Sequence, residues 1–260
     1  MSNSFPYSNF NQYAFRVFRR NLTVFTKTWK TNIFFNFFEP LLYLAAMGWG
    51  LGSFVGEING LSYIQFIAPG MIASSAMWSS SSECTYDSYV RLHYQKTYHA
   101  IVATPVQIDE VVVGDMLTGV FKSVLYGSVI LLVITLLGLV PSLWALAVPL
   151  VLVLCGFVFA ELGMVWTGLV PGIDSFSYFF TILITPMFLF SGVFFPLEAL
   201  PETVRILAWF LPLYHIVILL RSLVLGVVTP ALLLHAAWLI VFIVALFPLP
   251  LYLMRRRMVK

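Results

Sequence analysis

The stretch 111-VVVGDMLTGVFKSVLYGSVILLVITLLGLV-140 decides the class of protein, because it is long, apolar and carries only two charged side chains, Asp115 and Lys122. A helix that crosses the hydrocarbon core of a membrane needs about 20 apolar residues, so this stretch predicts a transmembrane helix. Leu143–Val170 predicts another, with Glu161 as its one charged residue. The link between them is so short that we expect the two helices to be antiparallel neighbours.

Four further stretches are long and apolar enough to predict spans, namely residues 33–55, 63–84, 178–195 and 232–254. The expected fold is an all-α integral membrane domain over residues 1–260 with six transmembrane helices. Sixty per cent of the residues are hydrophobic, only 10 per cent are charged, and the mean hydropathy is +0.94. Soluble domains carry about 25 per cent charged residues, so a soluble protein is excluded. Serines at 79–82 predict that the second span faces protein rather than lipid.

Several other classes of function find no support in the sequence. The net charge of +3 is too small to argue for nucleic-acid binding. Cys84 and Cys155 lie in apolar surroundings, which predicts two buried thiols and no disulfide. No His, Cys, Asp or Glu residues have a metal-ligand spacing. The first 30 residues lack the pattern of a secretory signal peptide. No G-x-x-x-x-G-K-[ST] motif occurs, so we expect no ATP site of the P-loop type and no cofactor bound directly.

Residues 196–230 hold two apolar runs that are each too short to span and are separated by Pro212. Basic residues cluster at both ends of the chain, and short basic flanks stay in the cytoplasm. Two cytoplasmic termini require an even number of spans, so we interpret 196–230 as a re-entrant helical hairpin on the outer side. Such backbone survives at membrane depth only where protein or water surrounds it. Its candidate functional residues are Pro196, Pro212, His215 and Arg221.

Two segments assigned to the inner side are amphipathic. Residues 10–30 combine an apolar, aromatic face with a basic one, which is typical of a helix that lies on the membrane surface. Residues 86–105 carry a stripe of tyrosines opposite a charged stripe, and a helix there must end before Pro105. The second segment is either another surface anchor or a short helix that docks in a groove of a partner protein.

Three strings of residues resemble ABC-2 type exporter permeases. The first is Glu83-x-Thr85-Tyr86, then Arg91, then Lys96-Thr97-Tyr98-x-Ala100-Ile101-x-Ala103-Thr104-Pro105. The second is Ser191-Gly192-Val193-Phe194-Phe195-Pro196-Leu197, Leu200-Pro201, Leu211-Pro212-Leu213-Tyr214-His215 and Arg221-x-Leu223-x-Leu225-Gly226. The third, similar to the subgroup that contains the nodulation protein NodJ, is Ser62-Tyr63-x-x-Phe66-x-Ala68-Pro69-Gly70.

The resemblance implies a permease subunit that pairs with a second copy of itself. It also implies one cytoplasmic ABC ATPase on each copy, which would bind the ATP and Mg²⁺. Residues 86–105 would then hold the coupling helix that enters a groove of the ATPase, and the loop Pro171–Phe176, which contains Asp174, would make a second, smaller contact. Tyr94, Tyr98 and Arg91 are the expected anchors, since tyrosine and arginine are favoured in such grooves. The candidate coupling residues are Glu83, Tyr86, Arg91, Tyr94, Lys96, Tyr98, Pro105 and Asp174.

Charged residues at membrane depth are costly and indicate either function or a buried partner; here they are Glu39, Asp115, Lys122 and Glu161. Lys122 and Glu161 lie at matched depth on neighbouring helices, so we expect them to pair. That pair would either fix the rotation of the helices or form a gate or a site for substrate headgroups. Glycines repeat every four residues near the end of the first span, which predicts close helix packing there; the residues are Gly48, Gly52 and Gly56.

The predicted function is the permease subunit of an ATP-driven exporter in a bacterial inner membrane, with no enzymatic activity of its own. The resemblance implies a lipo-oligosaccharide or lipid-linked polysaccharide as cargo, with hydrophobic drugs as the alternative. From another class, an ion-coupled secondary transporter would use Glu39, Lys122 or Glu161 as ion sites. A lipid-modifying enzyme would need a convergent acid/base set, which the sequence lacks.

Overall fold

A computed structural model describes residues 10–58 and 60–258; within α1 it describes the side chains of residues 12–29, 38 and 40–45. These residues form an all-α bundle, and they contain no β-strand beyond an isolated bridge between Ile58 and Leu61. Glu39 was singled out in the sequence, but its side chain lies outside the described part. The α-helices longer than four residues are α1 (Phe10–Ala45), α3 (Tyr63–Ser82), α4 (Thr97–Val102), α5 (Ile108–Leu136), α6 (Val148–Leu169), α8 (Thr185–Phe190), α9 (Glu202–Trp209), α10 (Pro212–Leu225), α11 (Leu232–Leu246) and α12 (Pro248–Met258).

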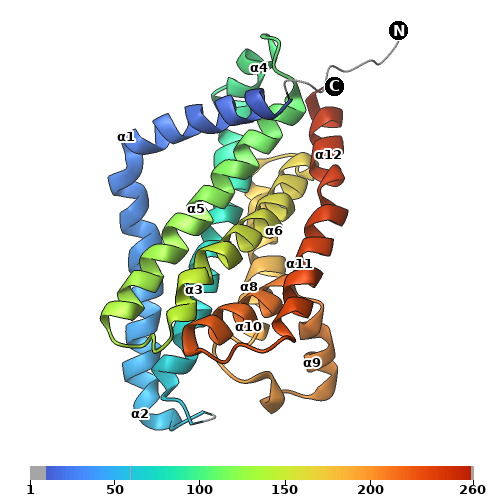
Figure 1. Cartoon of the computed structure of the whole chain (residues 1–260). Helices are drawn as coiled ribbons and strands as arrows, with labels where there is room; N and C mark the ends of the chain where they lie inside the picture. The colour runs from blue at the N-terminus through green and yellow to red at the C-terminus, as the bar shows by residue number, and fades with distance from the viewer. Residues whose placement is uncertain (1–9, 59, 259–260) are drawn as a thin grey trace.

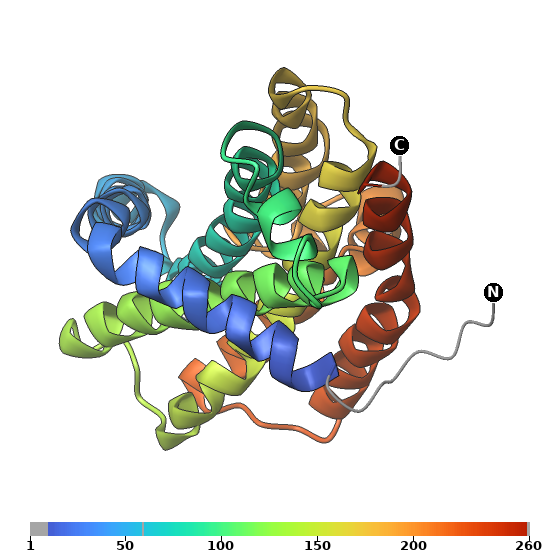
Figure 2. The same cartoon turned by 90° about the horizontal axis from the view of Figure 1, so that it is seen from above.

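Helix α1 combines the predicted surface helix and the predicted first span. It lies across the end of the bundle and then turns down along its side (Figures 1 and 2). The helix is continuous, so the predicted segments 10–30 and 33–55 are joined without a break. The π-helical turn η2 (Ala46–Leu51) and α2 (Gly52–Val55) complete the second of them. Its first part crosses α5 closely, because a Cβ atom on Gly114 would lie 2.6 Å from Val17 Cβ.

The protein is a multi-pass membrane protein. Among the described residues, four stretches are long and apolar enough to cross a membrane: Ile108–Leu136, Leu143–Leu169, Ile173–Phe190 and Leu232–Met258. They match four of the six predicted spans, and the fifth predicted span ends at Phe190 rather than at residue 195. The first two predicted spans are helical but fall outside this set: α3 is rich in serine, and the described residues of the first span give a shorter apolar helix, Pro40–Val55.

The segment 196–230, predicted as a re-entrant hairpin, folds as α9 and α10, which are bent by 86° relative to each other, the geometry of a broken span or of a re-entrant loop. Pro212 is the first residue of α10, where its missing N–H costs nothing because the first turn of a helix has no internal acceptor for it. Gly226 ends α10 with a φ of +82°. Both helices lie at the end of the bundle opposite α4, whereas the start of α1 and the end of α12 lie on the α4 side (Figure 1).

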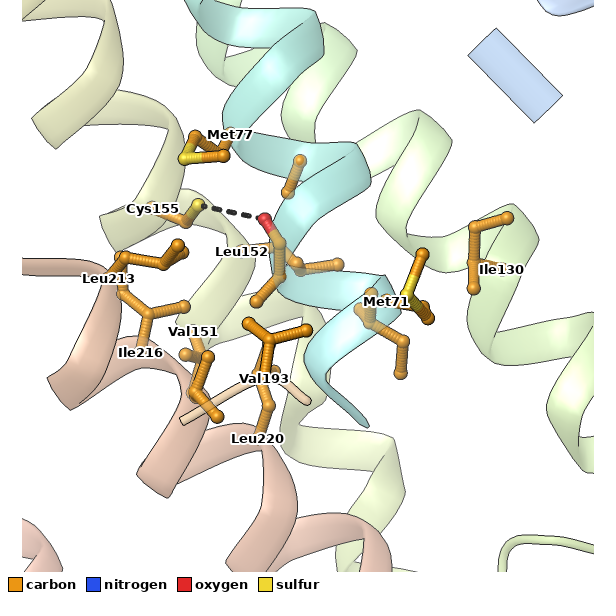
Figure 3. Close-up of a cluster of buried hydrophobic side chains, with 14 of the residues drawn as sticks. Met71, Met77, Ile130, Val151, Leu152, Cys155, Val193, Leu213, Ile216 and Leu220 are labelled. Carbon is orange, nitrogen blue, oxygen red and sulfur yellow. Dashed lines mark hydrogen bonds between the residues drawn. The ribbon is translucent and has the colours of Figure 1, made fainter. Parts of the chain in front are cut away.

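The main core lies where α3, α5, α6 and α10 meet. Figure 3 shows side chains of these helices interlocked, among them Met71, Ile130, Leu152 and Leu220. The serine-rich end of α3 is buried as predicted, and Ser80 Oγ donates to Gly156 O at 2.8 Å. Cys84 and Cys155 are buried free thiols, which confirms the prediction from the sequence.

Close helix contacts at glycines occur in α5 and α6 as well as at the predicted run near the first span. A Cβ on Gly156 would lie 2.6 Å from Val120 Cα. Of the predicted set, Gly48 does pack closely, since its Cβ would lie 2.7 Å from Ile64 of the same chain, and Gly52 lies near Tyr63. Gly56 has a φ of +72° and follows the end of α2, so it is a turn residue and not a packing residue.

Candidate coupling site at the α4 end of the bundle

The predicted coupling segment is built differently from the single helix expected over Tyr86–Val102. Helix α3 continues beyond Ser82 through two π-helical turns, η3 (Glu83–Asp87) and η4 (Val90–Tyr94). It then breaks at Lys96, which has a φ of +54°, and the chain resumes as the six-residue helix α4. The end before Pro105 is confirmed, because α4 stops at Val102.

Asp115 of α5 is the acceptor that the surrounding elements share. Its Oδ1 accepts from Asn21 Nδ2 of α1 at 2.7 Å. Its Oδ2 accepts from Ser88 Oγ at 2.9 Å, from Arg91 Nε at 3.1 Å and Nη2 at 2.8 Å, and from Tyr98 Oη at 2.5 Å. One carboxylate therefore connects α1, the extension of α3, α4 and α5.

Arg91 and Lys122 carry the positive charge that offsets part of the negative charge at this site. Arg91 Nη2 lies 2.6 Å from Glu83 Oε1, and Lys122 Nζ pairs with Glu83 Oε2 and lies 3.0 Å from Asp87 Oδ2. Together with Asp115 these residues form what we call the charged network: Glu83, Asp87, Arg91, Asp115 and Lys122. It holds three carboxylates and two cations.

The predicted pair between Lys122 and Glu161 is wrong. Lys122 points toward the end of α3, where it pairs with Glu83 and Asp87. Glu161 is fully buried on α6, and its carboxyl oxygens have no hydrogen-bond partner within the part of the chain that the structure describes. Matched depth fixes the height of two side chains but not the direction in which each one leaves its helix.

Burial changes the protonation behaviour of the side chains outside the spans. Burial opposes the charge of Arg91, but Asp115 and Glu83 outweigh it and raise its pKa above the usual value. Burial, reinforced by the charge of Asp115, raises the pKa of the Tyr98 hydroxyl. Arg91 is therefore permanently charged, and Tyr98 keeps the proton that it donates to Asp115.

The expected anchors for a partner protein divide into exposed and buried residues. Tyr94 is 65 per cent exposed and remains a candidate, as do the exposed Lys96, Pro105 and Asp174. Tyr98 is fully buried against Asp115, and the Arg91 side chain is only 14 per cent exposed. The expectation that Tyr98 and Arg91 insert into a partner's groove is therefore wrong for this conformation. They hold the segment to the bundle instead.

The short helix α7 (Phe176–Tyr178) and the loop before it pack against the same segment. Phe176 contacts Tyr86 and Tyr89 through its ring, with centroid distances of 5.1 and 5.4 Å, and Tyr89 Oη donates to Pro171 O at 3.2 Å. Tyr86 also stacks on Phe180 at 5.6 Å. The proposed main contact and the proposed minor contact, around Asp174, thus belong to one connected surface.

Sequence reasoning missed several residues that complete this site. Arg257 Nη2 lies 2.8 Å from His93 Nε2, and Arg255 pairs with Asp109 at the start of α5. The basic C-terminus had indicated only membrane orientation. Asn21 and Ser88 gave no signal either, since uncharged residues in a polar segment are ordinary.

A cavity of about 400 Å³ lies between α1 and the charged network, lined by Arg20, Asn21, Phe25, Asp87 and Lys122 among others. A second cavity, of about 330 Å³, lies farther along the bundle between α1, α3 and α8. Its lining is mainly apolar and aromatic, with two serines; it includes Pro40, Tyr43, Ser74, Ser75, Trp78 and Phe188.

The hairpin residues lie at the opposite end of the bundle. His215 Nε2 is 2.8 Å from Trp209 O, its Nδ1 is 2.7 Å from His235 Nδ1, and its ring stacks on Trp238 at 4.3 Å. These contacts hold α10 against α11. Arg221 donates to Gly192 O, and Pro196 lies at the turn before the short helix η8 (Leu197–Ala199). No group of three potential metal ligands occurs among the described residues.

Comparison with known proteins identifies the family. A sequence profile of the ABC-2 type transporter family matches residues 13–225. The chain belongs to the ABC-2 type transporter family. The ABC-2 permease chain is 38 per cent identical over 244 residues to Nodulation protein J of Rhizobium leguminosarum bv. viciae, covering 94 per cent of both chains.

Two further relatives extend this similarity. Nodulation protein J of Rhizobium meliloti (strain 1021) is 36 per cent identical over 242 residues, covering 93 per cent of this chain and 92 per cent of the relative. The inner membrane transport permease YadH of Escherichia coli (strain K12) is 26 per cent identical over 234 residues, covering 89 and 90 per cent. Membership in this family makes the protein an exporter permease subunit and implies a cytoplasmic ATPase partner.

Proposed function

We propose that this permease works as a homodimer with two separate ATPase subunits and carries a lipo-oligosaccharide or lipid-linked glycan outward. Its termini and α4 face the cytoplasm, and ATP is hydrolysed on the partner. The observation that carries the proposal is the charged network. It connects an exposed tip, formed by Tyr94, Lys96 and α4, to helices that run the length of the bundle.

The network gives a physical route for the motion. When the ATPases move, the tip moves with them, and Tyr98 and Arg91 transmit the displacement to Asp115 on α5. Asn21 transmits it to α1. Since these groups are buried and fully paired, separating them is more costly than moving the connected helices together. The elements therefore respond as a unit.

Two surfaces support the proposed surroundings of the subunit. The most apolar window of Leu232–Met258 is only 6 per cent buried, which suits contact with membrane lipid. The first span exposes large side chains near its end, among them Trp49 and Phe54, and we assign the contact with the second copy to this side. The apolar cavity between α1, α3 and α8 would then face the path between the two copies.

The similarity to several Nodulation protein J chains supports the glycolipid cargo. The aromatic rings and serine hydroxyls of the apolar cavity suit an amphiphile that has both a hydrocarbon part and a sugar part. A hydrophobic drug would use the rings alone. Export assays that compare a lipo-oligosaccharide with a hydrophobic dye therefore distinguish the two cargoes.

Replacing Ala100 by Pro tests the coupling role. Ala100 N donates to Lys96 O at 3.1 Å, and proline removes this bond and breaks α4, at a cost of about 3 kcal/mol or more. We expect normal membrane insertion but loss of the ATPase, measured by co-purification in mild detergent. Ala100→Ser keeps the N–H and is the matched control.

A second variant distinguishes loss of the ATPase contact from general misfolding, which Ala100→Pro could also cause. Tyr94 is exposed, so Tyr94→Ala should leave the thermal stability unchanged while it weakens the contact with the ATPase. The exposed Tyr252 of α12 provides the control, Tyr252→Ala. If the Tyr94 and Ala100 variants both keep the ATPase and export normally, the tip is only a surface anchor.

A further inference from the structure

A small cavity at the hairpin end of the bundle has no role in the coupling described above. It has a volume of about 280 Å³ and lies between the bend that follows α8, α9 and α10. Pockets for drug-sized ligands have volumes of about 300–1,000 Å³, so this cavity suits a headgroup or an ion rather than a whole amphiphile. Its polar lining comprises Ser191, Glu198, Arg205, Tyr214 and Arg221.

Arg221 is held rigidly at the inner wall of this cavity. Its Nη2 donates to Gly192 O at 2.7 Å and to Phe66 O at 3.2 Å, and its guanidinium lies 4.0 Å from the centre of the Phe66 ring. These contacts fix the side chain through one nitrogen. Its Nε is buried and has no acceptor among residues 10–58 and 60–258.

A second donor in the same cavity is also unused. Ser191 is fully buried, and its Oγ has no hydrogen-bond partner in the described part of the protein. Leaving a buried donor unpaired is costly, and each unpaired buried group in a native structure calls for an explanation such as a bound ion; both of these residues line the same cavity. Gly192 has a φ of +78°, so the bend that places Ser191 is a specifically shaped turn.

Charge indicates what kind of acceptor fits. Arg205 is exposed and lines the same cavity, while Glu198 is the one acidic residue of the lining. Two guanidinium groups and one carboxylate leave the cavity with a net positive charge. An oxyanion accepts strong hydrogen bonds from guanidinium and hydroxyl donors, and phosphate in particular offers several oxygens to them.

We propose that this cavity binds a phosphate group, carried by a lipid headgroup at the outer membrane surface or free in solution. Arg221 Nε, Ser191 Oγ and Arg205 are the donors, and Glu198 lowers the affinity through its like charge. The inference concerns binding at the end opposite the ATPase and does not depend on the proposed coupling function.

The test uses the purified full-length protein in a non-ionic detergent, without an ATPase. Binding is measured by titration calorimetry at constant ionic strength with two probes, sodium phosphate and dihexanoyl phosphatidylglycerol. A charged hydrogen bond contributes enough that Arg205→Gln should weaken binding about tenfold. Glu198→Gln should strengthen binding severalfold, and a misfolded protein would not show that effect. The exposed Arg256 provides the control, Arg256→Gln, which should bind as the unmodified protein does.

The outcomes separate the source of the phosphate from the existence of the site. Binding of both probes supports a site for the phosphate group itself, and binding of the lipid alone supports a headgroup site; both require the opposite shifts for Arg205→Gln and Glu198→Gln. No saturable binding, or binding that neither substitution changes, would overturn the proposal.

Discussion

Asp115→Asn is the substitution that most directly tests the charged network. Asparagine has the same shape but no charge, and its amide nitrogen cannot accept a hydrogen bond. Asp115 accepts hydrogen bonds from Asn21, Ser88, Arg91 and Tyr98 through its two carboxylate oxygens. In the variant, an NH₂ group replaces one of these oxygens, so the hydrogen bonds to that oxygen are lost. Arg91 keeps Glu83 as a partner, which limits the loss.

The size of the effect follows from the burial of the carboxylate. Asp115 is 1 per cent exposed, and breaking a buried ion pair by removing one partner costs about 3–5 kcal/mol. For a chain of this size, 1 kcal/mol corresponds to about 2–4 °C in the melting temperature. The midpoint should therefore fall by about 6–20 °C, measured by the thermal unfolding of the purified protein in detergent.

A matched control is Asp174→Asn, since Asp174 is an exposed aspartate near the same end of the bundle and surface substitutions change stability by no more than about 0.5 kcal/mol. If Asp115→Asn lowers the melting temperature no more than this control does, Asp115 does not hold the elements together. A double-mutant cycle with Tyr98→Phe should also show coupling between the two positions.

Two further substitutions test the packing around the network. In a double-mutant cycle, Lys122→Met should show an interaction energy of about 0.5–3 kcal/mol with Glu83→Gln, because Lys122 pairs with Glu83. It should show none with Glu161→Gln. Coupling to Glu161 and none to Glu83 would instead support the Lys122–Glu161 pair expected from matched depth. Gly156→Ala should destabilise the protein by about 1–3 kcal/mol, because the new Cβ would lie 2.6 Å from the backbone of Val120. Gly50→Ala is the control, since a Cβ there would meet open space. Equal melting temperatures for the two variants would contradict the close crossing of α5 and α6.

The sequence alone predicted the parts of the fold that depend on hydrophobicity and on proline. Long apolar stretches marked the spans, and Pro212 marked the bend of the hairpin. Helix ends were predicted less well, because α1 continues through a segment that is polar on one face only. Whether a helix face contacts lipid, water or protein depends on which other helices pack beside it, and a local stretch of sequence does not encode that packing.

The candidate site was predicted in outline, but the direction of its side chains was not. The tyrosine stripe was read along one helix, yet the break at Lys96 turns Tyr98 inward and leaves Tyr94 outside. A lysine with positive φ has no sequence signature comparable to that of glycine. Likewise, the partner of Lys122 depends on the rotation of α5, which only the packed bundle determines.

The π-helical turns η3 and η4 make the chain length between α3 and Lys96 a functional quantity in its own right. A π turn bonds residue i to residue i+5 and so accommodates extra chain within an otherwise α-helical run. Deleting one residue from Glu83–Asp87 would convert the π turn into an ordinary α turn, and because the π turn absorbs that residue, Arg91 would keep its direction toward Asp115. Deleting one residue from the regular part of α3 would instead rotate everything downstream by about 100° and shift it by about 1.5 Å. Natural loss of a single residue should therefore occur within the π turns and not in the regular part of α3.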